Sequence, residues 1–142
     1  MPIRSLQTSC ARETEALGAE LARGLRPGDV VLVRGELGSG KTTLVRGAAR
    51  ELGVQGAVTS PTFTIGNRYR VGELTVSHLD LYRLGALANE DPALLADYIG
   101  EGRIAFVEWP EDGAEELADT RAVVRISHRG ADRREVEIED CA

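Results

Sequence analysis

Two runs of four consecutive apolar residues, at positions 30–33 and 104–107, are the strongest hydrophobic features of the chain. Neither run alternates with polar positions. Uninterrupted runs of this kind are typical of strands that are buried on both faces, as in the centre of a parallel sheet. A charged residue follows each run directly, Arg34 in one case and Glu108 in the other. The pattern therefore predicts two central strands with polar ends.

Apolar residues at every fourth position predict two helices. The first covers residues 13–25 and carries three leucines at this spacing. The second begins near Lys41 and ends before Gly53, a residue that commonly terminates helices. Short helices are also expected at 92–98 and 111–117.

Alternating segments predict the remaining strands. Residues 62–71 and 74–82 form one hairpin around a tight turn, residues 122–127 and 134–139 form a second, and residues 2–9 form an edge strand. Helices and strands alternate around the buried runs. The predicted class is therefore α/β, as a single domain over 1–142, with a mostly parallel central sheet, antiparallel edge strands and few helices.

Composition supports a folded domain and excludes several classes. Of the 142 residues, 42% are hydrophobic and 28% charged, which is typical of globular proteins rather than disordered or fibrous chains. No segment has the apolar length of a membrane helix or the core of a signal peptide, so we expect a cytoplasmic protein without a membrane partner. Cys10 and Cys141 lack the spacing of a metal site, and free thiols are expected.

The distribution of charge indicates which binding partners to expect. The net charge is −6. Residues 72–142 carry seventeen acidic and seven basic side chains, whereas residues 1–71 carry six acidic and ten basic ones. An acidic total argues against a protein that coats DNA. A local basic patch of arginines remains an alternative to scattered, solvated side chains; its members would be Arg46, Arg50, Arg68 and Arg70. Lys41 is the single lysine beside sixteen arginines, which suggests that an ammonium group is required there.

The sequence GELGSGKT at 35–42 matches the phosphate-binding motif G-x-x-x-x-G-K-[ST] and lies between a predicted buried strand and a helix. Glycines let successive backbone N–H groups point at phosphate oxygens, and the start of the helix adds positive charge. Lys41 would reach the β- and γ-phosphates, and the hydroxyl of Thr42 would serve Mg²⁺. The motif makes the predicted α/β domain P-loop NTPase-like. The predicted nucleotide-binding residues are Gly38, Ser39, Gly40, Lys41, Thr42 and Thr43.

Hydrolysis further requires an acid near the metal ion and a group that positions water. Glu108 and Asp80 each follow a predicted strand and could reach the edge at which the glycine-rich loop lies, although each could also be a solvated strand end. For His78 and Trp109, ordinary packing roles compete with roles near the nucleotide. Residues 60–63 could sense the γ-phosphate or form a simple turn. No Asn-Lys-x-Asp sequence is present, which favours adenine over guanine.

Four segments together resemble the bacterial TsaE family, the small P-loop ATPase of tRNA threonylcarbamoyladenosine biosynthesis. They occur in the order GELGSGKTTLVRG, SPTFTIGNRY, HLDLYRL and VEWPE, and the resemblance runs over about residues 13–111. The last two segments are far more specific than the phosphate-binding motif.

This resemblance implies a weak ATPase that uses ATP and Mg²⁺ and acts with TsaB and TsaD, which modify position 37 of ANN-decoding tRNAs. Contact with tRNA would be indirect, through the complex. The resemblance implies that Thr42 and Glu108 serve the metal ion and that Asp80 acts in ATP turnover, while Thr43 and Trp109 occupy further signature positions. We take Lys41, Asp80 and Glu108 as the predicted catalytic residues, and the two acids could exchange roles.

Two other functions are compatible with the motif. A small-molecule kinase could use Arg133 and Arg134 as a miniature lid, and it would yield a phosphorylated metabolite instead of free phosphate. A non-catalytic module would bind ATP to promote assembly and would remain functional after Asp80→Ala.

Overall fold

The computed structural model describes residues 3–36, 40–59, 66–80, 98–109 and 120–141. These residues form seven strands and two helices. In chain order they are β1 (Ile3–Thr8), α1 (Ala11–Ala22), β2 (Val30–Arg34), α2 (Lys41–Glu51), β3 (Gly66–Val71), β4 (Leu74–Asp80), β5 (Arg103–Trp109), β6 (Thr120–His128) and β7 (Arg134–Asp140).

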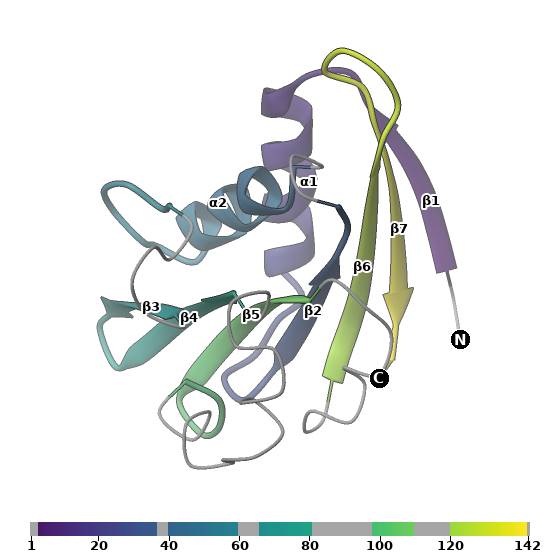
Figure 1. The fold of residues 1–142 in the computed structure, drawn as a ribbon. Coiled ribbons are helices and arrows are strands. Elements are labelled where there is room, and N and C mark those ends of the chain that lie inside the picture. Colours follow the sequence, from purple (N-terminus) through teal and green to yellow (C-terminus); the bar gives the residue numbers. More distant parts are fainter. Residues whose placement is uncertain (1–2, 37–39, 60–65, 81–97, 110–119, 142) are drawn as a thin grey trace.

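All seven strands belong to one sheet, in the order β1-β7-β6-β2-β5-β4-β3 (Figure 1). The four central strands β6, β2, β5 and β4 run parallel to one another. The outer pairs β1–β7, β6–β7 and β3–β4 are antiparallel. This arrangement confirms the predicted fold class. Strand β2 lies at the centre of the sheet, and each residue of 30–33 is accordingly at most 1% exposed.

Both helices cover the same face of the sheet (Figure 1). The helices and the strand residues beneath them form the larger core cluster, which includes Val31, Val33, Leu44 and Phe106. A smaller cluster on the opposite face is built from the alternate strand residues, such as Leu32 and Val107. Side chains alternate along each strand, so neighbouring positions pack into different core clusters on the two faces of the sheet.

Two glycines allow α1 and α2 to pack closely. A Cβ atom placed on Gly18 would lie 2.1 Å from the carbonyl oxygen of Leu44, and one on Gly47 would lie 1.9 Å from that of Glu15. Carbon and oxygen atoms do not approach this closely, so the helix crossing depends on the absence of side chains at both positions. The crossing therefore fixes the position of α2, which begins at Lys41 directly after the glycine-rich loop.

The sequence predicted most described elements within a few residues. Helix α1 begins two residues earlier than the predicted 13–25 and ends at Ala22, where Arg23 is the C-cap. Its leucine stripe is confirmed, since Leu17 is buried and Leu21 and Leu25 pack against the same core. Both predicted hairpins are present. The predicted helix at 111–117 and most of that at 92–98 lie outside the described residues.

Three of the four arginines considered as a basic patch have separate partners. Arg46 donates from Nε to the carbonyl oxygen of Val58 at 3.4 Å. The guanidinium of Arg50 pairs with Glu15 at 3.1 Å, and that of Arg68 lies 5.1 Å from the ring centre of Tyr98. These contacts favour the interpretation of scattered side chains.

Cys10 and Cys141 are free, as predicted. Burial raises the pKa of the Cys141 thiol, and the nearby carboxylates of Glu139 and Asp140 raise it further. A raised pKa keeps the thiol protonated and poorly nucleophilic. Within the described part of the chain, no helix is long and apolar enough to cross a membrane.

Candidate functional site

The carboxyl ends of the parallel strands place the predicted acids side by side. Glu108 near the end of β5 is in register with Val33 of β2 on one side and with Asp80, the last residue of β4, on the other. Adjacent strands lie about 4.8 Å apart, so the backbones of Asp80 and Glu108 are immediate neighbours. The ends of β4 and β5 therefore bring the two predicted acids to one edge of the sheet.

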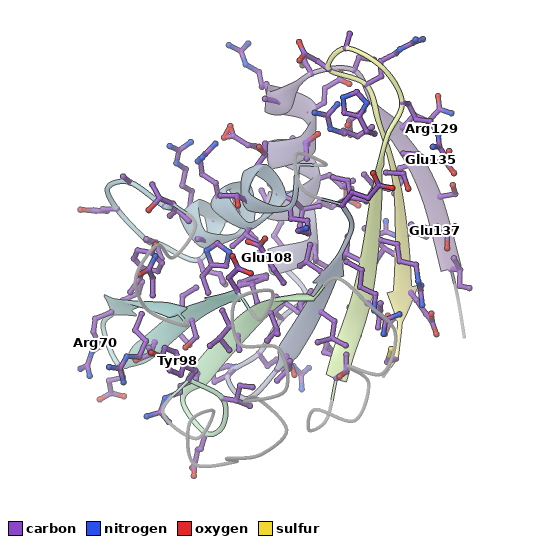
Figure 2. All side chains as sticks on the ribbon, viewed as in Figure 1. Arg70, Tyr98, Glu108, Arg129, Glu135 and Glu137 are labelled. Atoms are coloured by element: carbon purple, nitrogen blue, oxygen red, sulfur yellow. The ribbon has the colours of Figure 1, made fainter. Side chains whose placement is uncertain are left out.

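Both acids share the strand face that the helices cover. Phe106, two residues before Glu108, and Val76, four residues before Asp80, both belong to the core beneath the helices. Since strand side chains alternate, Glu108 and Asp80 lie on that same face. Figure 2 shows Glu108 between the sheet and α2. Glu108 is 4% exposed, which is unusual for a residue with a carboxylate and requires hydrogen-bond donors nearby.

The start of α2 is the second part of the site. Gly40 is its N-cap and has a φ of 106°, a left-handed conformation that glycine adopts without strain. Lys41 follows as the first helical residue and is 5% exposed. Its Nζ donates to the carbonyl oxygens of Gly35 at 2.5 Å and Glu36 at 3.3 Å. The single lysine of the chain is thus buried against its own glycine-rich loop.

One oxygen of Glu108 joins the helix to the sheet. The hydroxyl of Thr42 donates to Oε2 of Glu108 at 3.3 Å. The same oxygen is hydrogen-bonded to Nε2 of His78, which is fully buried on β4. Glu108 therefore receives contacts from the first turn of α2 and from a neighbouring strand.

A small pocket of about 50 Å³ lies on the other side of the same helix start. Its walls come from α1, α2 and the connection between β6 and β7, and its lining residues are Ala11, Thr14, Gly40, Thr43, Asp132 and Arg134. A Cβ on Gly40 would lie 3.4 Å from Nε of Arg134, so this guanidinium packs against the end of the glycine-rich loop. Thr42 thus faces the acids, and Thr43 faces this pocket.

The structure brings together Lys41, Thr42, Asp80 and Glu108 of the predicted site, with Gly40 and Thr43 beside them. Gly38 and Ser39 lie outside the described residues, as does the segment 60–63. Trp109 is described only as the last residue of β5. Of the two arginines considered as a lid, Arg134 lines the pocket next to Gly40.

Two features were missed by the sequence reasoning. The strand face of His78 was predictable, because His78 precedes Asp80 by two residues, but its hydrogen bond to Glu108 depends on the register of β4 against β5. The contribution of Ala11 and Thr14 to the pocket depends on how α1 crosses α2. No local sequence pattern predicts that crossing.

The oxygen groups present are suitable for Mg²⁺. The hydroxyl of Thr42 and the carboxylate of Glu108 are hard ligands, and they already lie within hydrogen-bond distance of each other. Among the described residues, no group of three or more His, Cys, Asp or Glu side chains could hold a metal ion. Few protein ligands are typical of Mg²⁺ that is bound largely through phosphates and water.

A glycine-rich loop that joins a central parallel strand to a helix, with acids at adjacent strand ends, defines a P-loop-like α/β protein. The family model described as "Threonylcarbamoyl adenosine biosynthesis protein TsaE" matches residues 8–136. The chain therefore belongs to the TsaE family.

Curated relatives support this membership. A Streptomyces coelicolor protein named as tRNA threonylcarbamoyladenosine biosynthesis protein TsaE is 44% identical over 118 residues, covering 82% of this chain and 80% of its own length. The Bacillus subtilis protein of that name is 40% identical over 87% of this chain and 77% of its own length. The Synechocystis protein is 46% identical over 69% of this chain, but the match spans 64% of its own length.

A solved structure supports the fold. The crystal structure of YdiB from Bacillus subtilis is 31% identical in sequence and superposes with a TM-score of 0.74. The superposition covers 99% of this chain and 87% of that one. The resemblance to TsaE that the sequence motifs indicated is thus confirmed by the family model, by relatives and by the fold.

Proposed function

We propose that this protein binds ATP with Mg²⁺ at the carboxyl ends of β2, β5 and β4 and hydrolyses it. The observation that carries the proposal is the contact between Thr42 and Glu108, which joins the first turn of α2 to the end of β5. A hydroxyl on the phosphate-binding helix and a carboxylate on an adjacent strand are the protein groups that hold Mg²⁺ in P-loop NTPases. Bound Mg²⁺ would neutralise charge on the β- and γ-phosphates.

The residues of this chain would divide the remaining work. Backbone N–H groups of the loop and of the start of α2, from Gly38 to Thr43, would bind the phosphates. Lys41 would place its ammonium on the β- and γ-phosphates, where it counters the charge that develops on the transferred group. Asp80, in register beside Glu108, would orient or deprotonate the attacking water.

The nucleoside end would lie toward the pocket beside Thr43. A nucleotide whose phosphates cross the start of α2, with the metal ion on the side of Thr42, extends toward the opposite side of that helix. There the guanidinium of Arg134 and the carboxylate of Asp132 line the pocket. These groups could contact the base and the ribose hydroxyls.

The biological setting follows from the family. TsaE proteins are named for threonylcarbamoyladenosine biosynthesis, and we propose that this chain acts in the same tRNA modification with TsaB and TsaD. The ATP-bound and ADP-bound forms would bind these partners differently, because loss of the γ-phosphate releases the protein groups that contact it. Contact with tRNA would be made through the complex.

Substitutions of the two acids test the assignment. Asp80→Asn is expected to leave Mg²⁺-dependent ATP affinity within about threefold of wild type and to lower turnover by about 100-fold or more, since only the water is affected. Glu108→Gln removes a charged ligand and is expected to remove most of the gain in ATP affinity that Mg²⁺ provides. The two effects are separated by titrating nucleotide with and without Mg²⁺ and by measuring phosphate release in the presence of TsaB and TsaD.

The products of the same assay distinguish the other functions. Free phosphate supports the ATPase. A phosphorylated metabolite with no free phosphate would support a kinase, and tight ATP binding without turnover, even with both partners, would support a non-catalytic module. An Asp80→Asn variant with wild-type turnover would contradict the role given to Asp80.

A further inference from the structure

His78 is buried, polar and not yet assigned a role in the proposed site. It lies on β4, between β3 and β5, and its side chain is 0% exposed. Its Nε2 contacts Oε2 of Glu108, the oxygen that also accepts a hydrogen bond from Thr42. A buried histidine in the sheet interior thus contacts the carboxylate that we propose for Mg²⁺.

We propose that His78 is a positioning residue that orients the carboxylate of Glu108 for the metal ion. The inference rests on the proposed Mg²⁺-nucleotide site and adds a supporting residue to it. Carboxylates that bind metal ions are commonly held by hydrogen bonds from a second layer of residues, and loss of such a bond weakens metal binding.

Hydrogen-bond accounting assigns the proton of the imidazole. An ionised carboxylate only accepts hydrogen bonds, so Nε2 of His78 must carry the hydrogen that it shares with Glu108. Nδ1 is buried and has no hydrogen-bond partner among the described residues. A hydrogen at Nδ1 would therefore be buried without an acceptor, whereas a bare ring nitrogen is tolerated more easily. The tautomer that donates to Glu108 therefore carries its hydrogen on Nε2.

The imidazole of His78 has fewer torsions than the carboxylate of Glu108, and the sheet fixes the backbone of both residues. His78 pairs in register with Asn67 of β3 on one side and with Phe106 of β5 on the other. The backbone of Glu108 is paired on both sides too, with Val33 of β2 and Asp80 of β4, but a glutamate has three side-chain torsions to restrict and a histidine has two. A hydrogen bond from the fixed imidazole selects among the orientations of this carboxylate before the metal ion binds.

Glutamine and asparagine distinguish positioning from simple packing. The amide nitrogen of glutamine can reach the place of Nε2, whereas the shorter asparagine places its nitrogen near that of Nδ1. Both substitutions remove the ring, so a role of the ring in packing alone would not leave the glutamine variant with wild-type Mg²⁺ dependence. Ser77→Ala is the matched control: Ser77 is also fully buried on β4, but its side chain lies on the opposite face of the sheet.

The first experiment titrates a fluorescent ATP analogue against each variant over a range of Mg²⁺ concentrations and in excess EDTA. His78→Asn is expected to raise the half-saturating Mg²⁺ concentration about tenfold and to leave the affinity in EDTA unchanged. His78→Gln is expected to lie within about threefold of wild type, and Ser77→Ala to match wild type. Wild-type Mg²⁺ dependence in His78→Asn, or equal shifts in the Asn and Gln variants, would overturn the inference.

A second measurement needs no substitution. Long-range ¹H–¹⁵N NMR of the wild-type protein reports which ring nitrogen of His78 carries hydrogen, and the hydrogen is expected on Nε2. Hydrogen on Nδ1 alone would refute the positioning role even if the variants fail to fold. If wild-type protein binds the analogue equally with and without Mg²⁺, the proposed function itself fails, and this result is distinct from a failure confined to His78.

Discussion

Lys41→Ala is expected to lower ATP affinity by about 100-fold or more and to reduce turnover below detection. Preorganised cationic or hydrogen-bonding groups on a reacting centre typically contribute about 10²- to 10³-fold each. Lys41 is the single lysine of the chain, and its ammonium is already held at the glycine-rich loop by the carbonyl oxygens of Gly35 and Glu36. Isothermal titration with ATP and Mg²⁺ measures the first effect, and phosphate release measures the second.

Three further variants sharpen this test. Lys41→Met keeps most of the side-chain volume and removes the charge, and it is expected to behave like Lys41→Ala. Lys41→Arg is also expected to fail, because a planar guanidinium does not fit a site that is shaped for a compact ammonium. Arg50→Ala removes a positive charge from the same helix, where Arg50 pairs with Glu15, and should leave ATP binding unchanged. ATP binding by folded Lys41→Ala at wild-type strength would refute the phosphate-binding role.

Gly47→Ala is expected to destabilise the protein by about 4 kcal/mol or more, which lowers the melting temperature by roughly 10 °C or more in a chain of this size. The added Cβ would lie 1.9 Å from the carbonyl oxygen of Glu15, in the backbone of α1. A helix backbone cannot yield as a flexible side chain can, so α1 and α2 would have to separate. Thermal unfolding followed by circular dichroism measures the effect.

Gly24→Ala is the matched control for this substitution. A Cβ on Gly24 would lie 3.8 Å from the nearest oxygen, that of Leu21, which is an ordinary contact. Replacing this glycine is expected to leave stability unchanged or to raise it slightly, because alanine restricts the unfolded chain. A Gly47→Ala protein that melts within a few degrees of wild type would show that the close helix crossing is not needed.

The central sheet was predictable because two of the longest apolar runs of the sequence form strands in its middle. The runs at 30–33 and 104–107 are buried on both faces, and strands in that position are continuously apolar. The edge strands and hairpins followed from alternation and turn residues. The end of α1 was less predictable, because Leu25 continues the apolar spacing after the helix has ended at Ala22.

The sequence predicted those residues of the candidate site that belong to one short motif or directly follow an apolar run. Gly40, Lys41 and Thr42 belong to one contiguous motif, and Glu108 follows an apolar run directly. The hydrogen bond between His78 and Glu108 joins residues thirty positions apart and depends on the register of β4 against β5. Register between parallel strands is set by the packing of the whole sheet, so the sequence motif alone did not reveal this partner.

The pocket beside Thr43 illustrates the same limit of sequence reasoning. Its lining residues come from three separate segments that the helix crossing and the β6–β7 connection bring together. From the sequence, Arg134 was expected to begin a strand of the second hairpin and was considered as part of a kinase lid. The structure places it against Gly40, in the lining of this pocket.

The most direct test of the account is the threonylcarbamoyladenosine content of tRNA, measured by mass spectrometry of digested nucleosides after the protein is depleted. We predict that the modified nucleoside falls on depletion, that the wild-type protein restores it, and that Lys41→Ala at equal abundance does not. Persistence of the modification without the protein would contradict a role in this pathway, and restoration by Lys41→Ala would contradict the claim that ATP bound at this loop supports it.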